Sequence, residues 1–134
     1  MFNKTEQEII KNWQGDISLP VVSICSITYN HESYIEEAID SFLMQETDFP
    51  FEIVVGEDYS TDGTRQIIEE YLEQYPNIIK LITSDNNVGP NRNFMRTLNA
   101  CTGKYIAICE GDDYWIDDKK LKIQKRFLDN NKDF

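Results

Sequence analysis

Four short apolar runs alternate along this chain with segments whose apolar residues recur at helical spacing. The runs lie at residues 21–28, 51–55, 78–82 and 105–109, and the helical segments at 35–43, 67–72, 90–100 and 121–128. Short, continuous runs of β-prone residues are typical of buried strands. Strands that alternate with helices predict an α/β fold, a mainly parallel open sheet flanked by helices, with right-handed crossovers.

Polar segments follow three of the predicted strands. They are residues 29–31, 56–60 and 110–113. In open α/β sheets, ligands bind beyond the carboxyl ends of the strands, which lie along one edge. We therefore expect these segments to meet in one binding site, although each of them alone also fits a solvated turn.

The last segment is a cluster of acids, with Glu110, Asp112 and Asp113 around Gly111. Carboxylates crowded at the end of a strand repel one another, and a divalent cation relieves that repulsion. Magnesium and manganese take oxygen ligands and often share them with a substrate's phosphates. The cluster therefore predicts a Mn²⁺ or Mg²⁺ site for a phosphate ligand, and the alternative is a solvated acidic turn.

Asp58 directly follows the second strand, and its carboxylate can only accept hydrogen bonds. It suits a base that presents an N–H donor, as uracil and guanine do and cytosine does not. The alternative is an aspartate that forms a turn.

Three further residues are candidates for binding, and His31, which shapes its loop with Asn30, is the one candidate for acid–base chemistry by histidine. Tyr29 either forms an aromatic wall for a base or packs at the sheet edge, and Asn30 shapes its loop. Arg92 lies at the start of a helix, where anions bind, or is simply solvated. His31 is the chain's only histidine, and no serine or cysteine is placed to form a nucleophile pair with it.

Three helix starts carry capping signals. Ser33 and Glu36 have the spacing of a capping box, Asp62 is placed to cap the next helix, and Asp117 with Asp118 precedes the last one. We expect residues 1–20 to form an N-terminal helix, at 5–13, and a linker, both appended to a domain at 21–134.

Composition limits the partners. The net charge of −11 over 134 residues argues against nucleic acid, which binds basic surfaces. No apolar stretch could span a bilayer, and the N-terminus lacks the apolar core of a signal peptide. We expect a cytoplasmic domain that visits a membrane only through a partner, with three reduced cysteines.

Residues 21–124 resemble the nucleotide-binding half of the family 2 glycosyltransferases, which have the Rossmann-like GT-A fold. The segments that carry the resemblance are Val22-Ser23-Ile24 with Thr28-Tyr29-Asn30, then Glu57-Asp58-Tyr59-Ser60-Thr61-Asp62-Gly63-Thr64, then Asn87-Val88-Gly89, and finally Thr102-Gly103-Lys104-Tyr105-Ile106 leading into Glu110-Gly111-Asp112-Asp113-Tyr114-Trp115. Each segment is weak alone, but all of them in order are specific.

The resemblance implies a hexosyltransferase-type enzyme that uses a nucleotide-sugar donor, usually a uridine diphosphate sugar. A manganese or magnesium ion would join the diphosphate to Asp113, with Asp112 and Glu110 nearby, and would stabilise the leaving diphosphate as a Lewis acid. The residues expected to contact the donor are Thr28, Tyr29, Asn30, Glu57, Asp58, Arg92 and Asp112. The acceptor would be an unknown sugar or lipid-linked molecule, in cell-surface polysaccharide synthesis at the inner face of a membrane.

The chain also departs from the family pattern. Glu57 is the first acid of its motif, Tyr59 replaces a usual glycine, Ile27 stands where proline is common, and the metal motif begins with Glu110. The acceptor half normally follows the metal motif, so we expect the catalytic base to lie beyond Phe134 and the domain to be truncated. Alternative functions are a non-catalytic nucleotide-binding module, a nucleotidyltransferase-like domain and an acidic α/β domain without a ligand.

Overall fold

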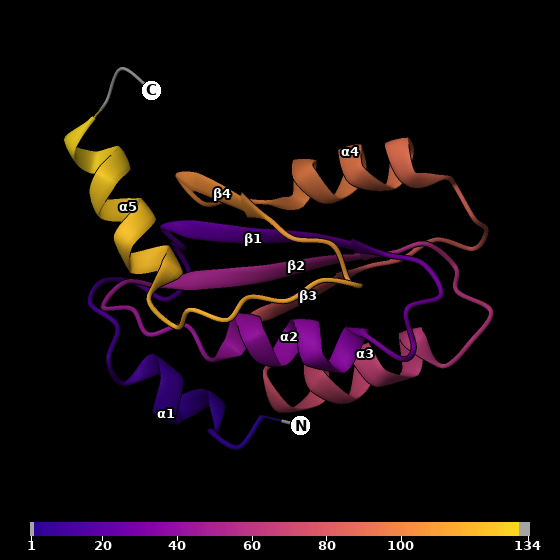
Figure 1. The fold of residues 1–134 in the computed structure, drawn as a ribbon, viewed down its shortest axis with the longest axis horizontal. Helices are drawn as coiled ribbons and strands as arrows, with labels where there is room; N and C mark the ends of the chain where they lie inside the picture. Colours follow the sequence, from indigo (N-terminus) through magenta and orange to yellow (C-terminus); the bar gives the residue numbers. More distant parts are fainter. Residues whose placement is uncertain (1, 132–134) are drawn as a thin grey trace.

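The computed structural model describes residues 2–131, and its centre is a parallel sheet of four strands in the order β3-β2-β1-β4 (Figure 1). The strands are β1 (Val22–Thr28), β2 (Phe51–Glu57), β3 (Ile79–Ile82) and β4 (Tyr105–Ile108). In the central strand β1, Ile24 pairs with Ile53 of β2 on one side and with Ala107 of β4 on the other. The predicted α/β fold with a parallel open sheet is confirmed.

Helices cover both faces of the sheet. They are α1 (Glu6–Ile10), α2 (Ile35–Leu43), α3 (Thr64–Gln74), α4 (Pro90–Ala100) and α5 (Lys120–Asn130). Helix α4 lies on one face, and α2 and α3 lie on the other (Figure 1). A β-carbon on Gly56 would lie 1.9 Å from Oγ1 of Thr97, so glycine at this position lets α4 lie close to β2.

The core is one hydrophobic cluster that includes the inward side chains of β1, β2, α2 and α3. Ile24, Ile39, Ile53 and Ile68 are fully buried in it. At the edge strand β4 the covering is incomplete, because Ile108 remains 58% exposed. Among residues 2–131 we find no helix with the length and apolar composition needed to cross a membrane.

A buried carboxylate ties three strands together near the amino ends of β1 and β2. Oε1 of Glu52 lies 2.7 Å from Nζ of Lys80 on β3. Oε2 of Glu52 accepts hydrogen bonds from the Ser23 hydroxyl, the Thr102 hydroxyl and the backbone N–H of Thr102. Burial raises the pKa of Glu52, but Lys80 and these hydrogen bonds outweigh it and hold the pKa below its ordinary value.

The first helix packs against the rest of the fold. Ile9 is part of the core, and the Trp13 ring contacts Phe51 with centroids 5.2 Å apart. The carboxylate of Glu6 accepts the backbone N–H of Asn77, which follows α3. The N-terminal helix predicted at residues 5–13 is therefore shorter, and it is a packed layer of the domain.

The N-cap residues differ from the predicted ones, and they are Tyr34 for α2, Gly63 for α3 and Lys119 for α5. Helix α2 begins at Ile35, and the carbonyl of His31 accepts the N–H groups of Tyr34 and Ile35, so the predicted capping box at Ser33 is wrong. Asp62 precedes the N-cap residue Gly63, and its Oδ1 accepts the N–H of Thr64, the first residue of α3. Asp117 accepts the N–H of Lys119, directly before α5.

Candidate functional site

A cavity of about 350 Å³ opens at the carboxyl ends of the central strands. Its walls come from the end of β1 and the loop after it, from the loops after β2 and β4, and from the start of α4. The lining residues are Ile27, Thr28, Tyr29, His31, Asp58, Asn87, Pro90, Asn93 and Glu110. The segments predicted to meet at this edge of the sheet do so, because β1 lies between β2 and β4.

The loops after β1 and β2 are joined by hydrogen bonds. The backbone N–H of Asn30 donates to the Ser60 hydroxyl, and Oδ1 of Asn30 accepts the N–H of Thr61 at 2.8 Å. Asn30 and Tyr59 both adopt the left-handed backbone, with φ of 53° and 60°. Asn30 therefore shapes its loop as predicted, and its side chain is occupied by the neighbouring loop.

Asp58 is 2% exposed and holds a third loop in place. Oδ1 accepts the N–H of Val88 at 2.7 Å, and Oδ2 accepts the N–H of Gly89 at 3.0 Å. The Asn87 side chain donates to the carbonyl of Asp58. A carboxylate has about four lone-pair sites, so these bonds leave acceptor capacity toward the cavity that Asp58 lines.

Glu57 lies outside the lining of this cavity. It is the last residue of β2, it pairs with Thr28, and it is fully buried. Its Oε1 accepts the N–H of Ser60 at 2.7 Å, whereas Oε2 has no hydrogen-bond partner among the residues described. The structure thus gives Glu57 a role in the turn after β2, and the expected donor contact would need it to become accessible.

The two arginines of α4 differ in their contacts. Arg92 is exposed on the first turn of α4 and is not among the lining residues of the cavity. Arg96 contacts the end of β2 and its own helix: Nη2 donates to the carbonyl of Glu57, and Nε donates to Oδ1 of Asn93. The sequence analysis did not identify Arg96 or Asn93. The available signal was their separation of three residues, which places both side chains on the same face of α4.

The acidic loop is fastened to the end of β1 by its backbone. The N–H of Gly111 donates to the carbonyl of Ile27 at 3.0 Å. A β-carbon on Gly111 would lie 2.6 Å from Oγ1 of Thr28, so this close approach requires glycine. Behind the loop, the Trp115 ring packs on Phe42 of α2 with centroids 4.9 Å apart.

The three acids of this loop are exposed and differ in their surroundings. Glu110 lines the cavity, whereas Oδ1 of Asp113 accepts the N–H of Tyr114 within its own loop. Burial raises the pKa of the Cys109 thiol to about 11, and the negative charge of Asp113, then of Asp112 and Glu110, adds to this rise. Lys120 opposes this rise, so the thiol lies beside both the acids of the loop and one positive charge.

His31 connects the loop after β1 with the acidic loop. Its Nδ1 lies 2.8 Å from Oγ1 of Thr28, which is buried at the end of β1. Its Nε2 lies 3.8 Å from Oδ2 of Asp112, and the two side chains are 21% and 49% exposed. The sequence marked His31 only as the single histidine, because its contact with Asp112 depends on the pairing of β1 with β4.

The described residues include no group of three or more histidine, cysteine, aspartate and glutamate side chains arranged to hold a metal ion. The acids after β4 are nevertheless oxygen donors. They suit a hard cation that takes its remaining ligands from a diphosphate.

The catalytic base is the one site residue that the sequence analysis does not assign to a residue of this chain. It is expected beyond Phe134, and Phe134 itself lies outside the described residues, which end at residue 131. The position of the base therefore stays a prediction. The cavity and the acidic loop are the parts of the expected site that the structure describes.

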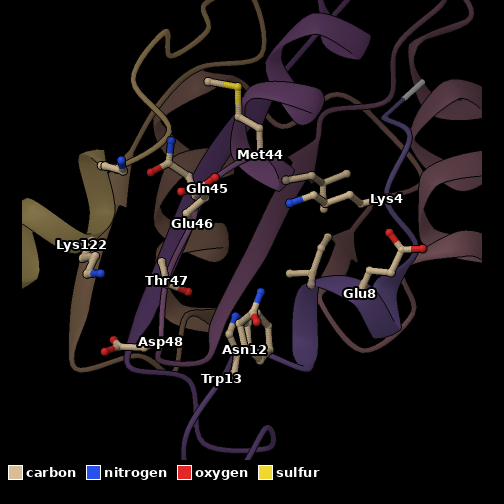
Figure 2. A pocket seen from close by; sticks show the side chains of 13 residues that line it. Lys4, Glu8, Asn12, Trp13, Met44, Gln45, Glu46, Thr47, Asp48 and Lys122 are labelled. Atoms are coloured by element: carbon tan, nitrogen blue, oxygen red, sulfur yellow. The ribbon is translucent and has the colours of Figure 1, made fainter.

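A second cavity of about 290 Å³ lies away from these loops, between α1, residues 43–48 and the start of α5 (Figure 2). Charged side chains of both signs surround it, namely Lys4, Glu8, Glu46, Asp48, Lys119 and Lys122. This second cavity shares no lining residue with the cavity at the carboxyl ends of the strands. Its lining also differs in carrying equal numbers of acidic and basic side chains.

Comparison with known proteins gives one family. The profile of the family described as glycosyl transferase family 2 matches residues 23–134. The uncharacterized protein Rv1520 of Mycobacterium tuberculosis is 47% identical over 110 residues, which cover 82% of this chain and 32% of that protein.

Two solved structures are also similar. S. aureus TarS 1-349 in complex with UDP has a TM-score of 0.71 and 35% identity over 81% of this chain and 32% of that one. Mannosyltransferase PcManGT from Pyrobaculum calidifontis, in complex with GDP-Man and Mn²⁺, has a TM-score of 0.72 and 26% identity over 92% of this chain and 37% of that one. The chain spans about a third of the length of the proteins it matches.

Proposed function

This chain belongs to glycosyl transferase family 2, and we propose that it binds the nucleoside diphosphate of a sugar donor, with uridine preferred, together with Mn²⁺ or Mg²⁺. The observation that carries the proposal is the cavity of about 350 Å³ where the loops after β1, β2 and β4 meet. It combines an aromatic side chain, a buried carboxylate and an adjacent acidic loop, which are the parts that a base and a metal-bound diphosphate need.

The base would lie against Tyr29, which is 44% exposed beside the cavity and can stack on an aromatic ring. Asp58 would accept the N–H that uracil presents, using the lone pairs that Val88 and Gly89 leave free. Thr28 lines the same cavity. A carboxylate at this place disfavours cytosine, whose ring nitrogen is also an acceptor.

The diphosphate would lie between the cavity and the acidic loop. Glu110, Asp112 and Asp113 would hold the cation, and Asp112 is the acid that faces the loop after β1 through His31. When bound, the ion supplies Lewis-acid stabilisation of the charge on the leaving diphosphate. Arg92, at the start of α4, would add a positive charge only if its side chain turned toward the cavity.

We also propose a complete reaction, the transfer of a hexose to a sugar or lipid-linked acceptor. This activity would belong to a protein as long as the relatives. Its catalytic base would lie beyond Phe134. The bound UDP of TarS and the bound GDP-Man and Mn²⁺ of PcManGT support the donor and the ion. The predicted roles in cell-surface polysaccharide synthesis and at the cytoplasmic face of a membrane are part of the same proposal.

Calorimetric titration of the chain with UDP in the presence of Mn²⁺ tests the proposal. We expect binding that disappears with a chelator, weakens at least about tenfold in Asp112→Asn, and is weaker for CDP. Mg²⁺ in place of Mn²⁺ shows which ion is preferred, and GDP tests the other base that presents an N–H donor.

Two results would contradict the proposal. Binding of UDP that is equal with and without the ion would exclude the metal site, and no binding of UDP or GDP under any condition would exclude the donor site. Asp85→Asn, which removes an exposed charge from the loop after β3, is the matched control and should bind UDP as the unmodified chain does.

A further inference from the structure

We infer that His31 is a nitrogen ligand of the divalent cation, beside Asp112, an inference that rests on the proposed function. The observation is the chain of contacts from Thr28 through the imidazole to Asp112. Nδ1 lies 2.8 Å from Oγ1 of Thr28, and Nε2 lies 3.8 Å from Oδ2 of Asp112.

The imidazole is held in a fixed place before any ligand binds. The backbone carbonyl of His31 accepts the N–H groups of Tyr34 and Ile35. These hydrogen bonds fix the His31 backbone just before α2. Thr28, which anchors Nδ1, is 2% exposed at the end of the central strand. Ligating histidines are commonly oriented in this way, by a hydrogen bond from the ring nitrogen that does not bind the metal.

The tautomer that donates from Nδ1 to Thr28 leaves a lone pair on Nε2, which then faces the Asp112 carboxylate. Two such acceptors repel each other unless a cation or a proton lies between them, and a bound divalent cation would take the place of the proton. Metal–oxygen and metal–nitrogen bonds of about 2.1 Å allow ligand atoms to be separated by about 3.0 Å at right angles and about 4.2 Å in opposition. The observed 3.8 Å lies between these limits.

His31 would add a nitrogen ligand to the carboxylate oxygens of the acidic loop. Asp113 is hydrogen-bonded within its own loop, to Tyr114. His31 would join the acids of the loop as a ligand, and the remaining positions would be open to diphosphate oxygens from the cavity that His31 lines.

The single histidine of the chain makes the experiment specific. Electron spin echo spectroscopy of the chain without a histidine tag, bound to UDP and Mn²⁺, should show the nitrogen coupling of a directly bound imidazole. The coupling should be absent in His31→Gln, and the affinity for Mn²⁺ at saturating UDP should fall about tenfold to a hundredfold. Glu32→Gln removes a neighbouring exposed carboxylate and should keep both the coupling and the affinity.

The same substitution should reduce the preference for Mn²⁺ over Mg²⁺, because imidazole suits transition metals and Mg²⁺ prefers oxygen. Thermal unfolding of His31→Gln and of the unmodified chain tests whether a lower Mn²⁺ affinity comes from the lost ligand or from a loss of folding. If UDP binds with Mn²⁺ but no imidazole coupling is seen, the inference is overturned and the proposed function stands. If neither UDP nor GDP binds with Mn²⁺ or Mg²⁺, both are overturned.

Discussion

The ammonium group of Lys80 on β3 lies 2.7 Å from the carboxylate of Glu52 on β2, and the carboxylate is almost completely buried whereas the lysine is half exposed. The pair lies near the amino ends of β1 and β2, away from the cavity. It connects the outer strand β3 to the centre of the sheet, so its effect should appear in stability and not in ligand binding.

Replacing Glu52 by glutamine should lower the free energy of unfolding by about 1–3 kcal/mol, because Lys80 loses its ion pair and Thr102 and Ser23 lose a charged acceptor. Chemical denaturation at neutral pH measures the change. Glu69→Gln breaks the exposed pair with Arg65 and should cost less than about 1 kcal/mol. Equal losses in the two variants would show that burial does not matter here.

The stabilisation by Glu52 should depend on pH. Its pKa is lower in the folded chain than the value of about 4.3 in an unfolded one. The contribution is therefore fully present above the unfolded pKa and is lost as the pH falls through the folded pKa. Denaturation curves between neutral and strongly acidic pH should show a smaller decline for Glu52→Gln than for the unmodified chain.

Asp58→Asn should weaken both the loop at residues 87–89 and the binding of uridine nucleotides. The amide oxygen of asparagine can accept one of the two N–H groups of Val88 and Gly89. The amide nitrogen would then face the second N–H group, and two donors cannot form a hydrogen bond. We expect a loss of about 1–3 kcal/mol in stability and a reduced preference for UDP over CDP, measured by calorimetry. Unchanged discrimination between the two nucleotides would assign Asp58 to the loop alone.

Tyr59 stands at a left-handed backbone position, with φ of 60°, where a side chain is strained. We expect Tyr59→Gly to be more stable than Tyr59→Ala by about 1 kcal/mol, because only glycine removes the β-carbon. Thermal unfolding of the two variants measures the difference. If alanine is equally stable, the strain at this position is negligible.

Gly111→Ala should disturb the acidic loop, because the new methyl group would lie 2.6 Å from Oγ1 of Thr28. Overpacking of this kind costs about 1–3 kcal/mol, and the shifted loop should also reduce affinity for UDP with Mn²⁺. Gly103→Ala is the control, since its methyl group would meet the backbone N of Ser23 at 2.6 Å, at the other end of β1. It should lower stability but leave the folded protein's affinity intact.

The sequence predicted the elements of the sheet well, because continuous apolar runs and their polar neighbours are local signals. The strand predicted at 51–55 extends to Glu57, and this extension is why Glu57 pairs with Thr28 and is buried. Asp58 is the first residue beyond that strand. Its contact with residues 87–89 depends on how β3 and α4 return to the sheet edge, and a local pattern does not contain that information.

The contacts that define the candidate site were less predictable for the same reason. His31 meets Asp112 only because β4 lies beside β1, and the order of strands in a sheet is a tertiary property. Arg96 reaches Glu57 from a neighbouring helix, whereas Arg92, which the pattern favoured, is exposed. The local error at Ser33 arose because the chain turns through the carbonyl of His31 instead of a serine hydroxyl.

The strand order also has a consequence for how the protein reaches its folded state. Strand β1 is the first strand of the chain, yet it stays without a partner on one side until β4 has been made, because Val22 pairs with Tyr105. Bringing such distant segments together costs more chain entropy than forming local contacts. We therefore expect the cavity to be completed late in folding, so that nucleotide binding during refolding would report that stage.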